Sequence, residues 1–118
     1  MRVKAYRNLH KQCWSVVAME GRDKGRVIGH LQFLQLKDVK FRVQPAGRRK
    51  VLREQRKNVH AYVVGTHEPS VAQELWDRVR YNPYEVETFV DMNGNAVHTA
   101  DSVFLNTDGK VYALNPGK

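Results

Sequence analysis

The sequence has very little cysteine and no long apolar run. Cys13 is the single cysteine among 118 residues, which excludes an intramolecular disulfide and favours a reducing compartment. No apolar run approaches the roughly 18 residues that a membrane-spanning helix needs. Residues 1–10 also lack the apolar core of a signal peptide. We therefore expect a soluble cytoplasmic protein that has no membrane partner.

Motifs that hold nucleotides, metals or activated nucleophiles are also missing. The segment "GRDKGR" (21–26) does not have the residue order of a P-loop, and neither a Rossmann glycine pattern nor a Gly-x-Ser-x-Gly elbow occurs. His10 and Cys13 stand at the spacing of two zinc ligands, but no second pair follows. We therefore expect no cofactor and no metal, and the sequence favours a protein that is not an enzyme.

Positive charge is abundant and unevenly distributed. The net charge is +8. Residues 1–65 hold 16 Lys and Arg against 4 Asp and Glu, whereas residues 66–118 hold 4 against 8. Such asymmetry predicts a basic working face, for which RNA, DNA or a nucleoprotein is the natural partner. The alternative is that the cations only keep a small protein soluble.

Strand-like alternation dominates most of the chain. Apolar residues recur at every second position, which places Val3 and Val39 toward a core and Lys4, Lys40 and Arg42 on the opposite face. The expected strands are residues 2–9, 12–20, 39–43 and 59–65, with residues 26–36 forming either one long strand or two short ones.

A basic helix is predicted between two of these strands. Pro45 suits a first helical turn, and residues 46–57 are mostly good helix formers that end at Asn58. Val51 and Leu52 share one face, so we expect Leu52, like Trp14, to lie in the core. The opposite face carries Arg49, Arg53, Arg56 and Lys57 at helical spacing.

The acidic half predicts a second helix and two hairpins. Residues 66–84 contain a capping-box pattern at Ser70 and Gln73 and helical spacing through Val79. Asn-Gly and Asp-Gly turns predict that residues 86–90 pair with 96–100 and that 102–106 pair with 110–114.

Together these elements predict the fold class. We expect residues 1–118 to form a single α+β domain, in which one or two helices pack on a mostly antiparallel, strand-rich sheet.

The candidate binding residues follow from the basic helix and the strands beside it. A rigid row of guanidinium groups matches phosphate oxygens, and exposed aromatic rings stack on unpaired bases. Tyr6, Trp14 and Tyr62 are the candidate stacking residues. The candidate nucleic-acid-binding residues are Arg48, Arg49, Lys50, Arg53, Arg56 and Lys57 of the helix, with Lys40, Arg42 and Lys4 of the strands.

Histidines beside basic residues allow a different hypothesis. Small ribonucleases use histidine as general acid and base next to Lys or Arg. Arg56, Lys57 and His60 lie close together in the sequence, and His10 lies beside Lys11. The simpler interpretation of His60 is a strand residue that is hydrogen-bonded to a neighbour.

Two stretches carry a resemblance to a known group of proteins. "YRNLHKQCWSV" (6–16) and "RKNVHAYVVG" (56–65) are similar to segments of small basic proteins encoded on phages and prophage-like mobile elements. The resemblance implies an accessory protein in the cytoplasm of a host cell. It also implies a target in host nucleic-acid machinery or in a defence system.

Three functions are therefore open at this point. The first is a phage accessory protein that engages nucleic acid or a host nucleoprotein complex through the basic helix and adjoining strands. The second is an inhibitor of a host defence complex, such as an anti-CRISPR protein, that acts by binding protein. The third is a small RNase toxin.

Overall fold

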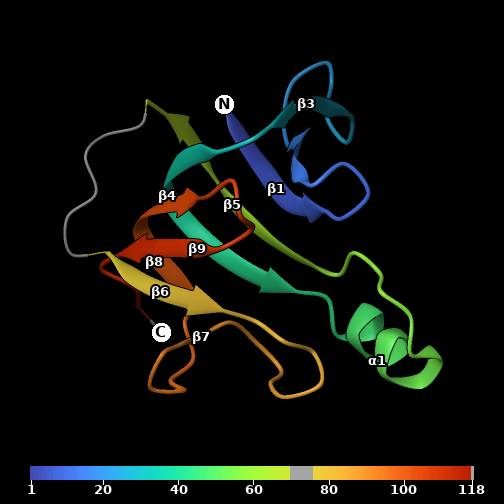
Figure 1. Cartoon of the computed structure of the whole chain (residues 1–118). Helices are drawn as coiled ribbons and strands as arrows, with labels where there is room; N and C mark the ends of the chain where they lie inside the picture. The colour runs from blue at the N-terminus through green and yellow to red at the C-terminus, as the bar shows by residue number, and fades with distance from the viewer. Residues whose placement is uncertain (70–75, 118) are drawn as a thin grey trace.

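The computed structural model describes residues 1–69 and 76–117, and these form one nine-stranded sheet and one helix. All strand pairings are antiparallel, in the order β3-β2-β1-β5-β4-β8-β9-β6-β7 (Figure 1). This arrangement confirms the predicted strand-rich α+β class. The elements are β1 Arg2–Asn8, β2 Cys13–Ala18, β3 Val27–Leu31, β4 Leu34–Val43, α1 Pro45–Glu54, β5 Ala61–Glu68, β6 Asp77–Arg80, β7 Val90–Asp91, β8 Thr99–Leu105 and β9 Val111–Leu114.

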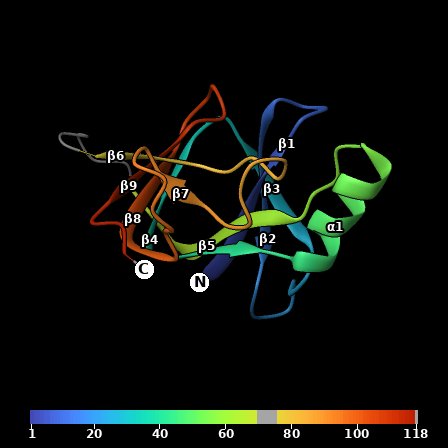
Figure 2. The same ribbon diagram turned by 90° about the horizontal axis from the view of Figure 1, so that it is seen from below.

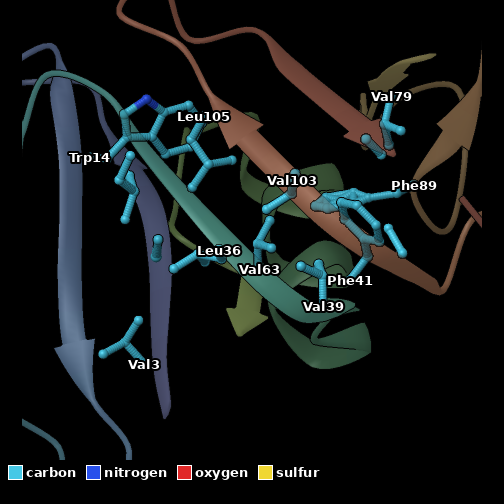
Figure 3. Close-up of a cluster of buried hydrophobic side chains, with 14 of the residues drawn as sticks. Val3, Trp14, Leu36, Val39, Phe41, Val63, Val79, Phe89, Val103 and Leu105 are labelled. Carbon is cyan, nitrogen blue, oxygen red and sulfur yellow. The ribbon is translucent and has the colours of Figure 1, made fainter. Parts of the chain in front are cut away.

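The sheet curls so that its distant parts share one hydrophobic cluster. The indole N–H of Trp14 on β2 donates to the carbonyl oxygen of Asn106, beyond the end of β8, at 2.7 Å. Trp14 is 4% exposed, so its predicted place in the core is confirmed. Figure 3 shows Leu36, Val63 and Val103 gathered in this cluster from three neighbouring strands. Alternation therefore gives the sheet two faces, one toward this cluster and one away from it.

The ambiguous segment 26–36 resolves into two strands, and β4 continues without a break through the predicted strand 39–43. A bulge interrupts the pairing of β4 with β5 between Lys37 and Lys40. Asp38 has a positive φ of 53° at this point. The extra residue lets Leu36 and Val39 both face the core although they stand three positions apart.

The helix is shorter than predicted. α1 ends at Glu54 because Gln55 adopts a left-handed conformation, with its N–H bonded to the Val51 carbonyl oxygen. Arg56 and Lys57 therefore lie in the connection to β5, outside the helix. α1 lies beyond the ends of β4 and β5 (Figure 1), and Figure 2 shows it on one side of the molecule.

Only one of the two predicted apolar helix residues is fully buried. Val51 is 3% exposed, whereas Leu52 is half-buried, so the prediction that Leu52 is a core residue is wrong. The helix is rotated so that Val51, Gly47 and Arg48 face the rest of the protein. A Cβ atom at Gly47 would overlap the side chain of His60, so this face packs closely.

The predicted second helix is wrong where it can be compared with the structure. Residues 66–68 belong to β5 and residues 77–80 to β6, and Val79 is a core residue of a strand. Sheet pairing with β9 and β7 overrides the helical spacing that included Val79. The capping pattern at Ser70 and Gln73 lies outside the described residues.

One predicted hairpin is confirmed and the other is much smaller than predicted. β8 and β9 pair across a turn that contains Gly109 at a φ of 87°. Residues 86–90 and 96–100 meet through one bridge between Val90 and Ala96, and β7 is only two residues long. Among the described residues, no helix is long and apolar enough to cross a membrane.

Candidate nucleic-acid interface

Three strand cations predicted from alternation come together on the face that points away from the core. Val64 of β5 pairs with Lys4 of β1 on one side and with Lys40 of β4 on the other. Arg42 pairs with Tyr62, two positions along β5. Residues from three segments that are distant in the sequence thus form one surface.

A fourth cation on this surface was missed by sequence reasoning. Lys37 is exposed and pairs with Thr66, two positions beyond Val64 on β5. Simple alternation places residues 37 and 40 on opposite faces, but the bulge at Asp38 restores them to the same face. We call Lys4, Lys37, Lys40 and Arg42 the basic strand face.

The helix contributes a second group of cations close to Arg42 along the chain. Arg49, Lys50 and Arg53 are exposed, and Arg49 and Arg53 are one turn apart on the side opposite Val51. Arg56 and Lys57 are exposed as well, in the connection to β5. The predicted single row of four cations is therefore a helical pair followed by a pair in the connection to β5.

Arg48 differs from the other candidate residues. Its Nε–H donates to the carbonyl oxygens of Pro83 and Val86, each at 3.1 Å. The side chain is partly buried and ties α1 to the segment after β6. Its first role in this structure is to position the helix.

The remaining candidate cations form no ion pair within the described residues. In residues 1–69 and 76–117, ion pairs join only the N-terminal amine to Glu20 and Arg80 to Glu85. Apart from Arg48, eight candidate cations remain. Neither these eight nor Lys37 has a carboxylate partner in that part of the chain. Unpaired cations at this density favour an anionic partner, because neighbouring like charges repel one another until they are neutralised.

The candidate stacking residues have different environments. Trp14 is buried, so it offers no ring face to a ligand. Tyr62 is partly exposed, and the Lys4 ammonium lies 4.9 Å from its ring centroid. Tyr6 is also partly exposed, and it borders a groove together with Tyr81 and Tyr84, which sequence reasoning missed. The segment "RYNPY" (80–84) indicated a turn, and nothing in it indicated a ligand-binding site.

His60 is held within the protein. It is 6% exposed and lies just before β5, with Nδ1 2.8 Å from the Asn58 carbonyl oxygen and Nε2 2.7 Å from the Tyr81 hydroxyl. The predicted hydrogen bond to a neighbour is confirmed, but the strand begins only at Ala61, so the prediction that His60 is a strand residue is wrong. Because both ring nitrogens are engaged, His60 has no free nitrogen to exchange a proton with a bound RNA in this arrangement.

Burial also affects the partner of His60. It raises the pKa of the Tyr81 phenol, an effect that the nearby positive charge of Arg48 opposes. The phenol is therefore neutral at physiological pH and acts as a hydrogen-bond donor to His60.

The His10–Cys13 spacing does not produce a metal centre in the described part of the chain. Cys13 is buried, and its Sγ lies 3.8 Å from Nδ1 of His30 on β3. Residues 1–69 and 76–117 contain no cluster of three side chains able to hold a metal.

Comparisons with known proteins place the chain in a phage family. The family model described as Mycobacterium phage L5 gene 82 protein matches residues 1–113. The Gene 82 protein of Mycobacterium phage L5 is 44% identical over 117 residues, an alignment that covers 92% of this chain and 93% of that protein. No solved structure matches the chain. The predicted resemblance to phage proteins is thereby confirmed, and the chain belongs to the family of the mycobacteriophage L5 gene 82 protein.

Proposed function

We propose that this protein is a phage accessory protein that engages nucleic acid, or a nucleoprotein through its nucleic acid, with the basic strand face and the exposed cations of and after α1. The observation that carries the proposal is the convergence of Lys4, Lys40 and Arg42 around Val64 and Tyr62 without carboxylate partners in the described chain. Phosphate groups neutralise such a surface and release counterions on binding.

The dimensions of the basic strand face suit a polyanion. Lys4 and Lys40 are separated by one intervening strand, which places their backbones about 10 Å apart. Both side chains are long and mobile enough to reach successive phosphates of one backbone. Tyr62 beside Arg42 adds an aromatic ring, over which the Lys4 ammonium lies 4.9 Å from the centroid. Contacts of this kind position a nucleic acid and carry little sequence information.

Binding of labelled RNA and DNA at low salt tests the proposal. The variant Lys4→Gln/Lys40→Gln/Arg42→Gln removes three cations from the basic strand face. If each exposed contact contributes at least about 0.5 kcal/mol, affinity falls at least about tenfold, and the loss grows as the salt concentration is lowered. The matched control is Arg22→Gln/Lys24→Gln/Arg26→Gln, which removes three exposed cations from the loop before β3.

The two variants separate a specific surface from general charge. The proposal expects the control variant to bind nearly as well as the wild type. Equal losses of affinity in both variants would mean that general positive charge, and not the basic strand face, is responsible for binding. The same samples test the RNase alternative, because cleavage would shorten the labelled RNA with time.

A second candidate function is inhibition of a host defence complex by protein binding. The observation that favours it is the edge strand β3, where Val27 and Ile28 are 47% and 43% exposed and Phe33, just beyond the strand, is 52% exposed. An apolar sheet edge can add a strand from a partner protein. Capture from host lysate with and without nuclease discriminates the two functions: partners of a nucleic-acid binder are lost with nuclease, and those of an inhibitor remain.

A further inference from the structure

A groove opens where two neighbouring strands separate. β1 and β5 pair as far as Ala5 and Val63. Beyond that point β1 stays with β2, through the pair Asn8 and Cys13, while β5 stays with β4. The space between the diverging strands is an open groove of about 750 Å³, lined on its other sides by Val51 of α1 and the segment after β6.

Aromatic rings and cations line the groove, and none of its lining residues is acidic. Three tyrosines border it, of which Tyr84 is 56% exposed. Arg7 and Lys57 stand on opposite walls, the first on β1 and the second before β5. Asn58 and Asn82 add amide groups, whereas the amide of Asn8 is already bonded to Ser15, His10 and Lys11. Rings to stack upon, amides to hydrogen-bond and a positive rim are the combination that binds unpaired nucleotides.

The guanidinium of Arg7 is held against the turn between β8 and β9. Its Nη2 donates to the Thr107 carbonyl oxygen at 3.1 Å, and its guanidinium lies 5.4 Å from the Trp14 ring centroid, so the group is held in place. Its Nη1 is buried and has no hydrogen-bond partner in the described part of the chain. Because Nη1 is buried, Arg7 contributes only positive charge near the groove, and the exposed Lys57 is the cation that a phosphate can reach.

We propose that this groove binds a single-stranded segment of nucleic acid, with one unpaired base against Tyr84 and its neighbouring tyrosines and with a backbone phosphate near Lys57. The inference rests on the proposed function, because the basic strand face would hold the flanking backbone. It adds that the nucleic acid bound in the groove is single-stranded. Bases of a duplex are stacked and paired, so they cannot turn into a groove of this kind without being extruded.

Fluorescence anisotropy with three fluorescein-labelled probes tests the inference. The probes are oligo(U) and oligo(dT) of about 12 nucleotides, within the usual length of a single-strand site, and a DNA duplex of the same length. Tyr84→Ala removes an exposed ring from the groove and should weaken binding of at least one single strand roughly 5- to 150-fold. Phe33→Ala is the matched control, since Phe33 is 52% exposed, lies between β3 and β4, and does not line the groove. Urea melts confirm that each variant is folded.

The outcomes distinguish the inference from the function on which it rests. Tighter binding of a single strand than of duplex, lost in Tyr84→Ala and kept in Phe33→Ala, supports the groove, and the two single strands report whether it takes RNA or DNA. Equal affinity for duplex and single strands, unchanged by Tyr84→Ala, overturns the groove and leaves the proposed function standing. Absence of binding to every probe at low salt overturns both.

Discussion

Removing one hydroxyl group, in Tyr81→Phe, should destabilise the protein by about 1–3 kcal/mol, the usual cost of leaving a buried polar atom unpaired. The Asn58 carbonyl oxygen can only accept a hydrogen bond, so Nδ1 of His60 carries the proton and Nε2 accepts from the Tyr81 hydroxyl. His60 is 6% exposed, and water therefore has little access to replace the lost donor. Phenylalanine keeps the edge contact with Phe89, whose ring centroid lies 5.4 Å away.

Urea denaturation at neutral pH measures this difference directly. Tyr84→Phe serves as the control, because Tyr84 is 56% exposed and its hydroxyl makes no hydrogen bond within the described residues. The control should change stability by no more than about 0.5 kcal/mol. An equally small change in Tyr81→Phe would mean that the His60–Tyr81 hydrogen bond does not hold this corner of the fold together.

The pH dependence of the same variant provides an independent check. Because burial raises the pKa of Tyr81 in the folded state, the neutral phenol is favoured by folding. The stability that the neutral phenol contributes is fully present below the pKa of Tyr81 in the unfolded chain, and it is lost as the pH rises through the pKa of Tyr81 in the folded state. The stability gap between wild type and Tyr81→Phe should therefore narrow at alkaline pH, and a gap that widens there would contradict the assignment.

Three further predictions concern the fold. Val51→Ala should lower the free energy of unfolding by about 1–3 kcal/mol, and Leu52→Ala, at a half-buried position, by clearly less. Urea melts measure both values, and the reverse order would mean that α1 is rotated from the orientation described. Gly65→Ala should lower the thermal midpoint, because a Cβ there would lie 2.9 Å from the Cβ of Leu36 in the core, and an unchanged midpoint would disprove that contact. Backbone hydrogen bonds, first from Asn95, lower the pKa of the Asp91 carboxyl. The stability that the ionised carboxylate contributes is therefore present above its pKa in the unfolded chain and is lost as the pH falls through its pKa in the folded state. Asp91→Asn should flatten the acidic side of a curve of stability against pH.

The sheet was largely predictable because alternation is a local signal that burial reinforces. Residues such as Lys40 and Arg42 alternate with core positions, and the structure has them on the face away from the core. Alternation could not reveal the bulge at Asp38, because nothing in the local pattern indicates an extra residue. Lys37 was missed for that reason. The strand order, which brings Lys4 beside β5, depends on pairing between distant segments and is also invisible in a local pattern.

The helical predictions were less successful for a related reason. Periodicity continued through Arg56 and Lys57, but the chain turns at Gln55 to begin the approach to β5. Val79 fits a helical spacing, yet tertiary pairing makes it a strand residue. The groove was not predictable at all, because it is formed by Arg7, Lys57 and Tyr84, which only the divergence of β1 and β5 brings together.

The most direct test of the nucleic-acid interface is the salt dependence of binding. Each phosphate that is neutralised lowers log affinity by about 0.7–0.9 per decade of salt, so the wild type should show a linear and steep decrease. In Lys4→Gln/Lys40→Gln/Arg42→Gln the slope should become shallower by about two to three units if each cation holds one phosphate. The slope of Arg22→Gln/Lys24→Gln/Arg26→Gln should remain close to that of the wild type. Equal slopes in wild type and the first variant would contradict the claim that the basic strand face holds a phosphate backbone.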